Sequence, residues 1–205
     1  MKKTEDLLRR AEADESHSSI NQAEAIFSDE PAAQNSFVFF KRELRKVEIW
    51  NRVSNLSEFE LFDENGEISP SRTISESHFI RISIKGSGKY DWVRVVKIID
   101  GPTEMVLTVK PTYDPTDQEG NKDKVSHFFT DEAENNFCLV RDALTINFFI
   151  IGLNEHENAE QTEGIIETIR NWITANFGSY LGMQKTQWST FAANFLELRA
   201  DEQRQ

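Results

Sequence analysis

The stretch from His78 to Ile151 limits the fold of this chain most strongly. It contains five runs rich in β-branched and aromatic residues, separated in part by short turn sequences such as Gly86-Ser-Gly-Lys89 and Asp100-Gly-Pro102. In the first run, isoleucines alternate with polar residues, which is typical of a half-buried strand. Consecutive strands joined by short turns pair antiparallel, because a parallel crossover needs about a dozen residues or more. The stretch therefore predicts an antiparallel meander.

Further helix and strand patterns flank the meander. Apolar residues recur every three or four positions over residues 36–53, 163–177 and 186–199, which indicates amphipathic helices. Residues 57–62 alternate as a first strand, and Asp63-Glu-Asn-Gly66 supplies the Asn-Gly pair of a tight turn. We therefore expect an α+β fold, in which an antiparallel sheet of five or six strands carries helices on one face, two of them C-terminal.

The first 35 residues are polar and acidic, and we expect them to form a mobile N-terminal arm before a single α+β domain over residues 36–200. Short helical patterns occur within the arm at residues 4–13 and 23–27. Segments this poor in apolar residues seldom order alone but can order on a partner. The arm is thus either a plain tail or a docking segment. Its candidate partner-binding residues are Leu7, Leu8, Ile26 and Phe27.

A second candidate interaction surface lies in the meander. Tyr90, Trp92 and Arg94 combine aromatic rings with an arginine, a mixture that is enriched at interface hot spots. Packing within the sheet is the alternative interpretation of the same residues. The predicted helix over residues 36–53 carries the one basic patch of the chain, either as a solvated face or as an anion contact.

Charge and cysteine usage limit the partners and the compartment. The net charge of −12 argues against a nucleic-acid partner and against an anionic lipid surface, and it favours a basic protein partner or self-association. Cys138 is the only cysteine, so the chain cannot form an internal disulfide, and we expect a cytoplasmic protein. No apolar run reaches membrane-spanning length.

Two loops resemble ligand motifs, but their spacing does not fit. Gly86-Ser-Gly-Lys89 joins two strands and precedes no helix, so a hairpin turn is expected rather than a phosphate loop. Residues 114–123 are rich in oxygen ligands, but the EF-hand register would begin at Pro115. A solvated acidic loop is expected there, with a weak cation site as the alternative.

The remaining candidate chemistry involves histidine and cysteine. Glu155-His156-Glu157 places an imidazole between two carboxylates, and a carboxylate can orient a histidine and raise its pKa. A surface loop is the plainer interpretation, and His127 and His78 could join only through the fold. Cys138 lies between Phe137 and Leu139, which indicates an inert thiol. No catalytic, cofactor or metal motif is present, so we predict no such residues.

The order of helix, meander and long C-terminal helix resembles the helix-grip family of START and polyketide-cyclase-like proteins, over about residues 36–177. The phrase Val47-Glu-Ile-Trp50-Asn-Arg-Val-Ser-Asn-Leu56 is similar to the early helix of that family. The resemblance implies an antiparallel sheet that wraps a C-terminal helix and encloses an apolar ligand cavity. The second C-terminal helix and the acidic N-terminal segment depart from the family pattern, and no cavity residue can be assigned.

Three functions therefore remain open. The first is a non-enzymatic interaction protein, a subunit or adaptor of a cytoplasmic assembly. The second is a helix-grip binder of a small apolar ligand, with its cavity between the sheet and helix 163–177. The third is a hydrolase or lyase that uses His156 or His127 with a nearby carboxylate. The absence of catalytic motifs favours the non-enzymatic functions.

Overall fold

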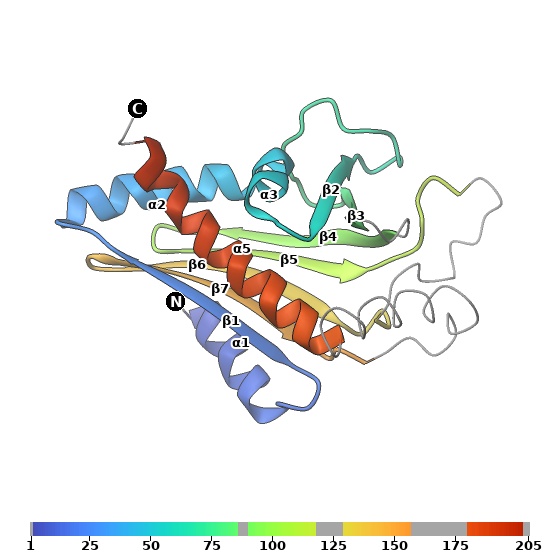
Figure 1. Ribbon diagram of the computed structural model, residues 1–205, viewed down its shortest axis with the longest axis horizontal. Coiled ribbons are helices and arrows are strands. Elements are labelled where there is room, and N and C mark those ends of the chain that lie inside the picture. The colour runs from blue at the N-terminus through green and yellow to red at the C-terminus, as the bar shows by residue number, and fades with distance from the viewer. Residues whose placement is uncertain (1, 86–89, 118–128, 157–179, 203–205) are drawn as a thin grey trace.

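The computed structural model describes residues 2–85, 90–117, 129–156 and 180–202. Seven strands form one antiparallel sheet in the order β1-β7-β6-β5-β4-β3-β2. The strands are β1 (Ser19–Ile26), β2 (Ser57–Phe62), β3 (Phe79–Ile84), β4 (Tyr90–Asp100), β5 (Glu104–Pro111), β6 (Glu134–Asp142) and β7 (Thr145–Leu153). The described helices are α1 (Lys2–Ala13), α2 (Glu30–Leu44), α3 (Val47–Val53) and α5 (Tyr180–Glu202). Figure 1 shows the curled sheet with α5 lying across it.

The predicted antiparallel α+β fold is confirmed, but the sheet has seven strands rather than five or six. The additional strand is β1, which pairs with β7 from Ser19↔Gly152 to Ile26↔Thr145. Its sequence alternates small or polar residues with two isoleucines, so local pattern indicated a tail with a short helical segment. Residues 19–26 form a strand because they pair with β7, since strand formation depends on pairing more than on local propensity.

Helices pack on both faces of the sheet, which corrects the expectation of one covered face. On one face, Leu7 and Ala11 of α1 pack with Val106, Cys138 and Ile151. The backbone N–H of Thr4 donates to Glu104 Oε1 at 2.7 Å, which holds the start of α1 on β5. The segment predicted as an arm therefore contributes a helix and a strand that contact residues of the 36–200 region; its mobility stays a prediction.

The predicted helix over residues 36–53 is two helices in the structure. Asp29 caps α2, where its Oδ1 accepts a hydrogen bond from the Ala32 N–H at 2.8 Å. Between α2 and α3 the chain turns, and Trp50 Nε1 donates to the Leu44 carbonyl oxygen at 2.9 Å. This hydrogen bond fixes α3 against the end of α2. The tight turn predicted at 63–66 is confirmed, with Gly66 at φ +81°.

The concave face of the sheet, opposite α1, holds the main core beneath α2, α3 and α5. Aromatic rings fill the space under the middle of α5. Ring centroids lie 4.6 Å apart for Trp50 and Phe137, and 4.9 Å apart for Phe148 and Phe195. Phe191 is fully buried among these rings. The main core is therefore a packed layer of aromatic side chains.

Helix α5 spans the two edges of the sheet. Gln187 Nε2 donates to Ser57 Oγ of β2 at 2.8 Å, and Ser189 Oγ donates to Asn21 Oδ1 of β1 at 3.0 Å. The helix predicted at 186–199 is confirmed and begins earlier, at Tyr180. The helix predicted at 163–177 lies outside the described residues. Among the described helices, none is long and apolar enough to cross a membrane.

Candidate functional site

The most unusual polar group of the described structure is the carboxyl of Glu155, just after β7. Asn154 adopts a left-handed backbone with φ +54°, which turns the chain sharply at the end of the strand. The N–H of Glu155 donates to the His17 carbonyl oxygen at 2.8 Å, and the Thr130 N–H donates to the His156 carbonyl oxygen at 3.0 Å. The turn folds the side chain of Glu155 back over the sheet, where it is only 6% exposed.

Gly152 makes room for this carboxyl. A Cβ atom at position 152 would lie 2.2 Å from Glu155 Oε1 and 2.6 Å from Ser19 Oγ. Gly152 pairs with Ser19 of β1 on one side and with Asn135 of β6 on the other. Residues two apart on a strand face the same side of the sheet. Gly152 therefore lies on the concave face with Phe148 and Ile150, which belong to the main core. Glu155 therefore lies at one end of the concave face, beyond the aromatic layer.

The hydrogen bonding of the Glu155 carboxyl is incomplete among the described residues. Within the described residues, neither of its oxygens makes a hydrogen bond of regular geometry, and the buried Asn135 Oδ1 also lacks one. Burial raises the pKa of Glu155 to about 7, and the nearby Ser19 hydroxyl lowers it only in part. A buried acceptor without a partner costs free energy, so such groups are retained mainly where they have a use.

Beside this site lies a pair of histidines, whose arrangement does not form a catalytic relay. The rings of His17 and His156 lie 4.2 Å apart between centroids. Asp14 Oδ1 and Ser16 Oγ both contact Nδ1 of His17, at 3.2 and 3.0 Å. A nucleophilic relay needs the serine and the acid on different ring nitrogens. His127 and Glu157 of the predicted cluster lie outside the described residues.

The predicted partner-binding residues have different environments. Leu7 is fully buried under the sheet, and Leu8 packs partly against the same cluster. Phe27 packs against the main core, whereas Ile26 is 73% exposed. Their role in binding a partner stays a prediction, but only Ile26 of these four presents most of its surface to solvent.

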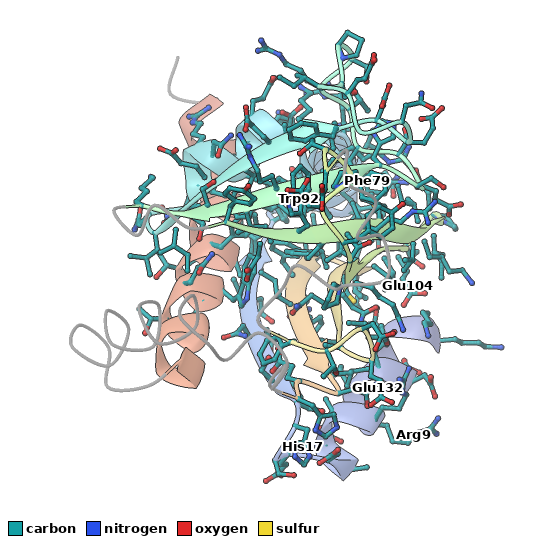
Figure 2. The ribbon with its side chains drawn as sticks, turned by 90° about the vertical axis from the view of Figure 1, so that its right-hand side faces the viewer. Arg9, His17, Phe79, Trp92, Glu104 and Glu132 are labelled. Atoms are coloured by element: carbon teal, nitrogen blue, oxygen red, sulfur yellow. The ribbon has the colours of Figure 1, made fainter. Side chains whose placement is uncertain are left out.

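The second predicted surface is an aromatic cluster on the face opposite the main core. Trp92 is fully buried, and its ring centroid lies 4.8 Å from that of Phe62. The Arg94 guanidinium lies 5.4 Å from the Phe79 ring, and Tyr90 is half-exposed. Figure 2 shows Phe79 and Trp92 together, at the opposite end of the sheet from His17. The interpretation of Trp92 as sheet packing fits its burial.

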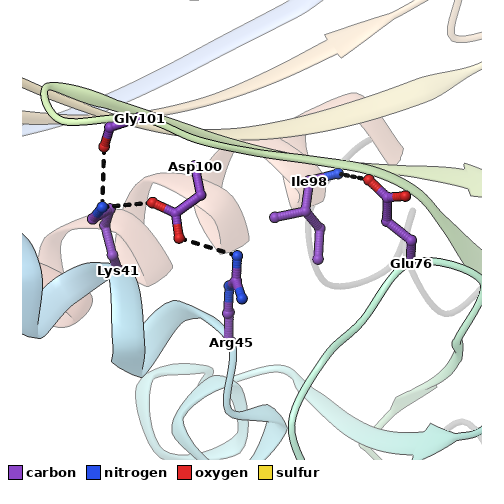
Figure 3. Close-up of polar contacts among 6 residues, drawn as sticks. All are labelled: Lys41, Arg45, Glu76, Ile98, Asp100 and Gly101. Carbon is purple, nitrogen blue, oxygen red and sulfur yellow. Dashed lines mark hydrogen bonds and ion pairs between the residues drawn. The ribbon is translucent and has the colours of Figure 1, made fainter.

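The basic patch on α2 is partly paired with carboxylates within the fold. Lys41 Nζ donates to Asp100 Oδ1 at 2.5 Å and to the Gly101 carbonyl oxygen at 3.0 Å, and Arg45 donates to Asp100 Oδ2 at 3.1 Å (Figure 3). These contacts hold α2 on the turn between β4 and β5. They leave the helix less positive charge for an external anion than the sequence alone suggests.

The other sequence candidates give no further site. Residues 86–89 lie outside the described residues, although Ser83 and Tyr90 on either side pair as a hairpin requires. In the predicted acidic loop, Asp114 Oδ1 accepts hydrogen bonds from the backbone and hydroxyl of Thr116. Burial raises the pKa of Cys138 to about 12, which agrees with an inert thiol. In the described ranges, no three His, Cys, Asp or Glu residues are grouped as a metal site would need.

Sequence reasoning assigned Glu155 to a loop and missed Gly152, Ser19 and Asn135. One signal was available: a glycine inside a β-run marks a close approach by other atoms. Gly152 stands at the end of the most apolar run, three residues before Glu155. The pattern could have indicated the site, but not that the carboxyl folds back over the glycine.

The comparisons support the fold and give no identity. No family model and no curated protein matches the chain. A hypothetical protein, jhp0584 from Helicobacter pylori, has a similar structure, with a TM-score of 0.53 at 9% identity over 88% of this chain and 87% of that one.

Two more distant structures have TM-scores too low to support an argument. The di-domain ARO/CYC protein StfQ of the steffimycin biosynthetic pathway has a TM-score of 0.42 at 10% identity, over 96% of this chain and 56% of that one. The extracellular domain of PknH from Mycobacterium tuberculosis has a TM-score of 0.34 at 11% identity, over 78% of this chain and 58% of that one. The chain thus has an α+β fold with a curled antiparallel sheet, shared with a protein of unassigned function.

Proposed function

We propose that this protein is a non-enzymatic binder of a small molecule, of the helix-grip type, whose ligand places an ammonium group or another hydrogen-bond donor on Glu155. The observation that carries the proposal is the carboxyl itself, which is buried and without regular hydrogen-bond partners among the described residues. A ligand donor would supply the missing hydrogen bond and offset the cost of burying the group.

The architecture supports this proposal. The chain runs β1, α2, α3, then the meander β2 to β7, and then α5, which grips the concave face and contacts both sheet edges. Among the described residues, aromatic rings pack beneath the middle of α5, where a helix-grip cavity would be expected. We therefore assign the ligand to the end of the concave face, beside the Glu155 carboxyl that occupies the space over Gly152.

The surroundings also suggest the remainder of the ligand. Trp188 of α5 packs on Phe137 with ring centroids 5.4 Å apart. Phe137 lies two residues along β6 from Asn135, on the same face. An apolar body beside these rings and a donor on the carboxyl together describe an alkylamine-like molecule.

The test is a titration with n-octylamine, using n-octanoate as the ligand of equal chain length and opposite charge. We expect the amine to bind at pH 8, where the carboxyl is ionised, and to lose at least about tenfold in affinity in Glu155→Gln. Glu132→Gln is the matched control, because Glu132 is exposed and its carbonyl oxygen accepts a hydrogen bond from Asn154. Equal binding of amine and octanoate, or equal affinity in both variants, would refute the proposal.

A second candidate is the interaction role predicted from the sequence. Its support is the exposed Ile26 on β1, a strand at one edge of the sheet. This role is compatible with ligand binding, because Ile26 lies at the opposite end of β1 from Ser19, which borders the Glu155 site. The cytoplasmic location stays a prediction.

A further inference from the structure

The two edge strands of the sheet differ in how their outward backbone groups are satisfied. On β2, Asn51 donates to the Phe59 carbonyl oxygen at 2.8 Å and accepts from the Phe59 N–H at 2.6 Å. The Ser57 N–H donates to Ser54 Oγ at 3.1 Å, and the Leu61 carbonyl oxygen accepts from the Ser69 N–H at 2.9 Å. The outer edge of β2 is thus closed by neighbouring side chains and a loop.

The outer edge of β1 is open in the described part of the chain. His17 and Phe27 direct their backbone groups toward the β7 side, through the bonds from Glu155 N–H to His17 oxygen and from Phe27 N–H to Leu144 oxygen. Because these directions alternate along a strand, the even-numbered residues of β1 direct theirs outward. Among the described residues, no hydrogen bond is made to the outward groups of Ile20, Gln22, Glu24 and Ile26.

An open edge strand is a template for pairing, and proteins usually protect such edges with charge, proline, a bulge or a cover. β1 carries one charged residue, Glu24, and no proline. Its two isoleucines are among the exposed large apolar residues, with Ile20 at 39% and Ile26 at 73%. The edge is therefore both chemically unsatisfied and apolar at its two ends.

We infer that two copies of this chain pair antiparallel through β1, about a two-fold axis at Ala23. In that register each exposed Ile20 lies opposite Ile26 of the second copy, and each Gln22 lies opposite Glu24. The apolar pair and the amide–carboxylate pair both stabilise an antiparallel ladder. The backbone groups of the four outward residues then pair with their equivalents, so that two seven-stranded sheets become one.

Neighbouring registers are less favourable. A shift that centres the axis on Gln22 places Ile20 opposite Glu24, which pairs an apolar side chain with a charge. A shift that centres it on Glu24 places two copies of Glu24 directly opposite, and like charges there are destabilising. Of these three registers, only the one centred on Ala23 pairs Ile20 with Ile26 and Gln22 with Glu24, and this self-complementarity favours a second copy over an unrelated strand as the occupant.

Small residues on β1 suit this arrangement. Ala23 and Ala25 face the main core and are only partly buried. At the two-fold axis Ala23 meets its own equivalent in a non-hydrogen-bonded pair, where Cα atoms are about 4.5 Å apart. That separation lies within the range that a disulfide can bridge. Two copies of Ala25 would be about 13 Å apart, since each is displaced two residues from the axis.

The first test is oxidative cross-linking of the full chain with Ala23→Cys, using Ala25→Cys as the matched control. We expect Ala23→Cys to form a covalent dimer and Ala25→Cys to stay monomeric. The wild-type chain controls for Cys138, which is buried. Equal cross-linking of the two variants, or none in either, would overturn the register.

The second test is sedimentation of variants over a concentration series up to about millimolar. Ile26→Lys should weaken dimerisation by about tenfold or more, whereas Ile68→Lys should not, although Ile68 is 69% exposed and thus equally accessible. Gln22→Lys should strengthen the dimer, because it places a cation opposite Glu24. A wild-type chain that stays monomeric throughout, a loss in both isoleucine variants, or no gain in Gln22→Lys would overturn the proposal. It does not depend on ligand binding, so octylamine should leave the dimer unchanged.

Discussion

The middle and the end of the concave face are built from the same strands but have opposite chemistry. In the middle, Phe137 and Phe148 meet α5 in a layer of aromatic rings. Two residue pairs beyond Phe137 along the ladder, Asn135 and Gly152 lie beneath a buried carboxyl that has no hydrogen bond of regular geometry among the described residues. The middle provides stability through burial, while the end retains a group that lowers it. The comparison therefore distinguishes the aromatic layer, which stabilises the fold, from the Glu155 site, which we assign to ligand binding.

The largest expected effect comes from opening the aromatic layer. Phe191→Ala should lower the free energy of unfolding by about 3–5 kcal/mol, because Phe191 is fully buried among other rings and its loss leaves a cavity. Chemical denaturation measures this loss. Val38→Ala on α2, where Val38 is 53% exposed, should change stability by less than about 0.5 kcal/mol. A small loss in Phe191→Ala would mean that the middle is loosely packed.

The next effect concerns the pH dependence of stability. The pKa of Glu155 is raised in the folded state to about 7 from an ordinary value of 4.5, so the folded state holds the proton more tightly. Its contribution is fully present below about pH 4.5 and is lost as the pH rises through 7, to a total of about 3 kcal/mol at most.

Glu155→Gln removes this titration, so the variant should become more stable relative to wild type as the pH rises from 4.5 to 8. Unfolding curves of both proteins over that range measure the difference. Glu132→Gln should show no such divergence, because Glu132 is exposed. If the free energies of unfolding of wild type and Glu155→Gln changed in parallel with pH, the carboxyl would be exposed to water rather than buried.

A smaller effect tests the glycine beneath the carboxyl. Gly152→Ala should displace the Glu155 side chain, because the new Cβ would lie 2.2 Å from its oxygen. We expect a loss of about 1–2 kcal/mol and loss of octylamine binding. In a Glu155→Ala background, Gly152→Ala should cost less stability than in the wild type, since the nearer of the two clashing groups is gone. An equal cost in both backgrounds would show that the loss does not come from the contact with the carboxyl.

The smallest effect is expected from the neighbouring hydroxyl. Ser19→Ala removes the one polar side chain that favours the charged form of Glu155, so the pKa of Glu155 should rise further. Stability at neutral pH should change by less than about 1 kcal/mol. An NMR titration of the carboxyl carbon measures this shift, and a fall in the pKa would contradict the assigned role of Ser19.

The sequence predicted the middle of the molecule far better than its end. The alternation of isoleucines and the aromatic stripe of α5 indicate which face of each element is buried. The meander and helix 186–199 could therefore be predicted. β1 could not, because Ser19 to Ile26 become a strand only through the ladder to β7. The Glu155 site combines residues more than a hundred positions apart, Ser19 with Asn135 and Gly152. No local pattern reports such a contact.

The most direct test of the account is the ionisation of Glu155, followed by carboxyl-carbon NMR with and without n-octylamine. We predict a midpoint near pH 7 in the free protein, since burial opposes the charge, and a lower midpoint when the amine stabilises the carboxylate. A midpoint near 4.5 that does not move on adding the amine would contradict both the burial of the group and its role in binding.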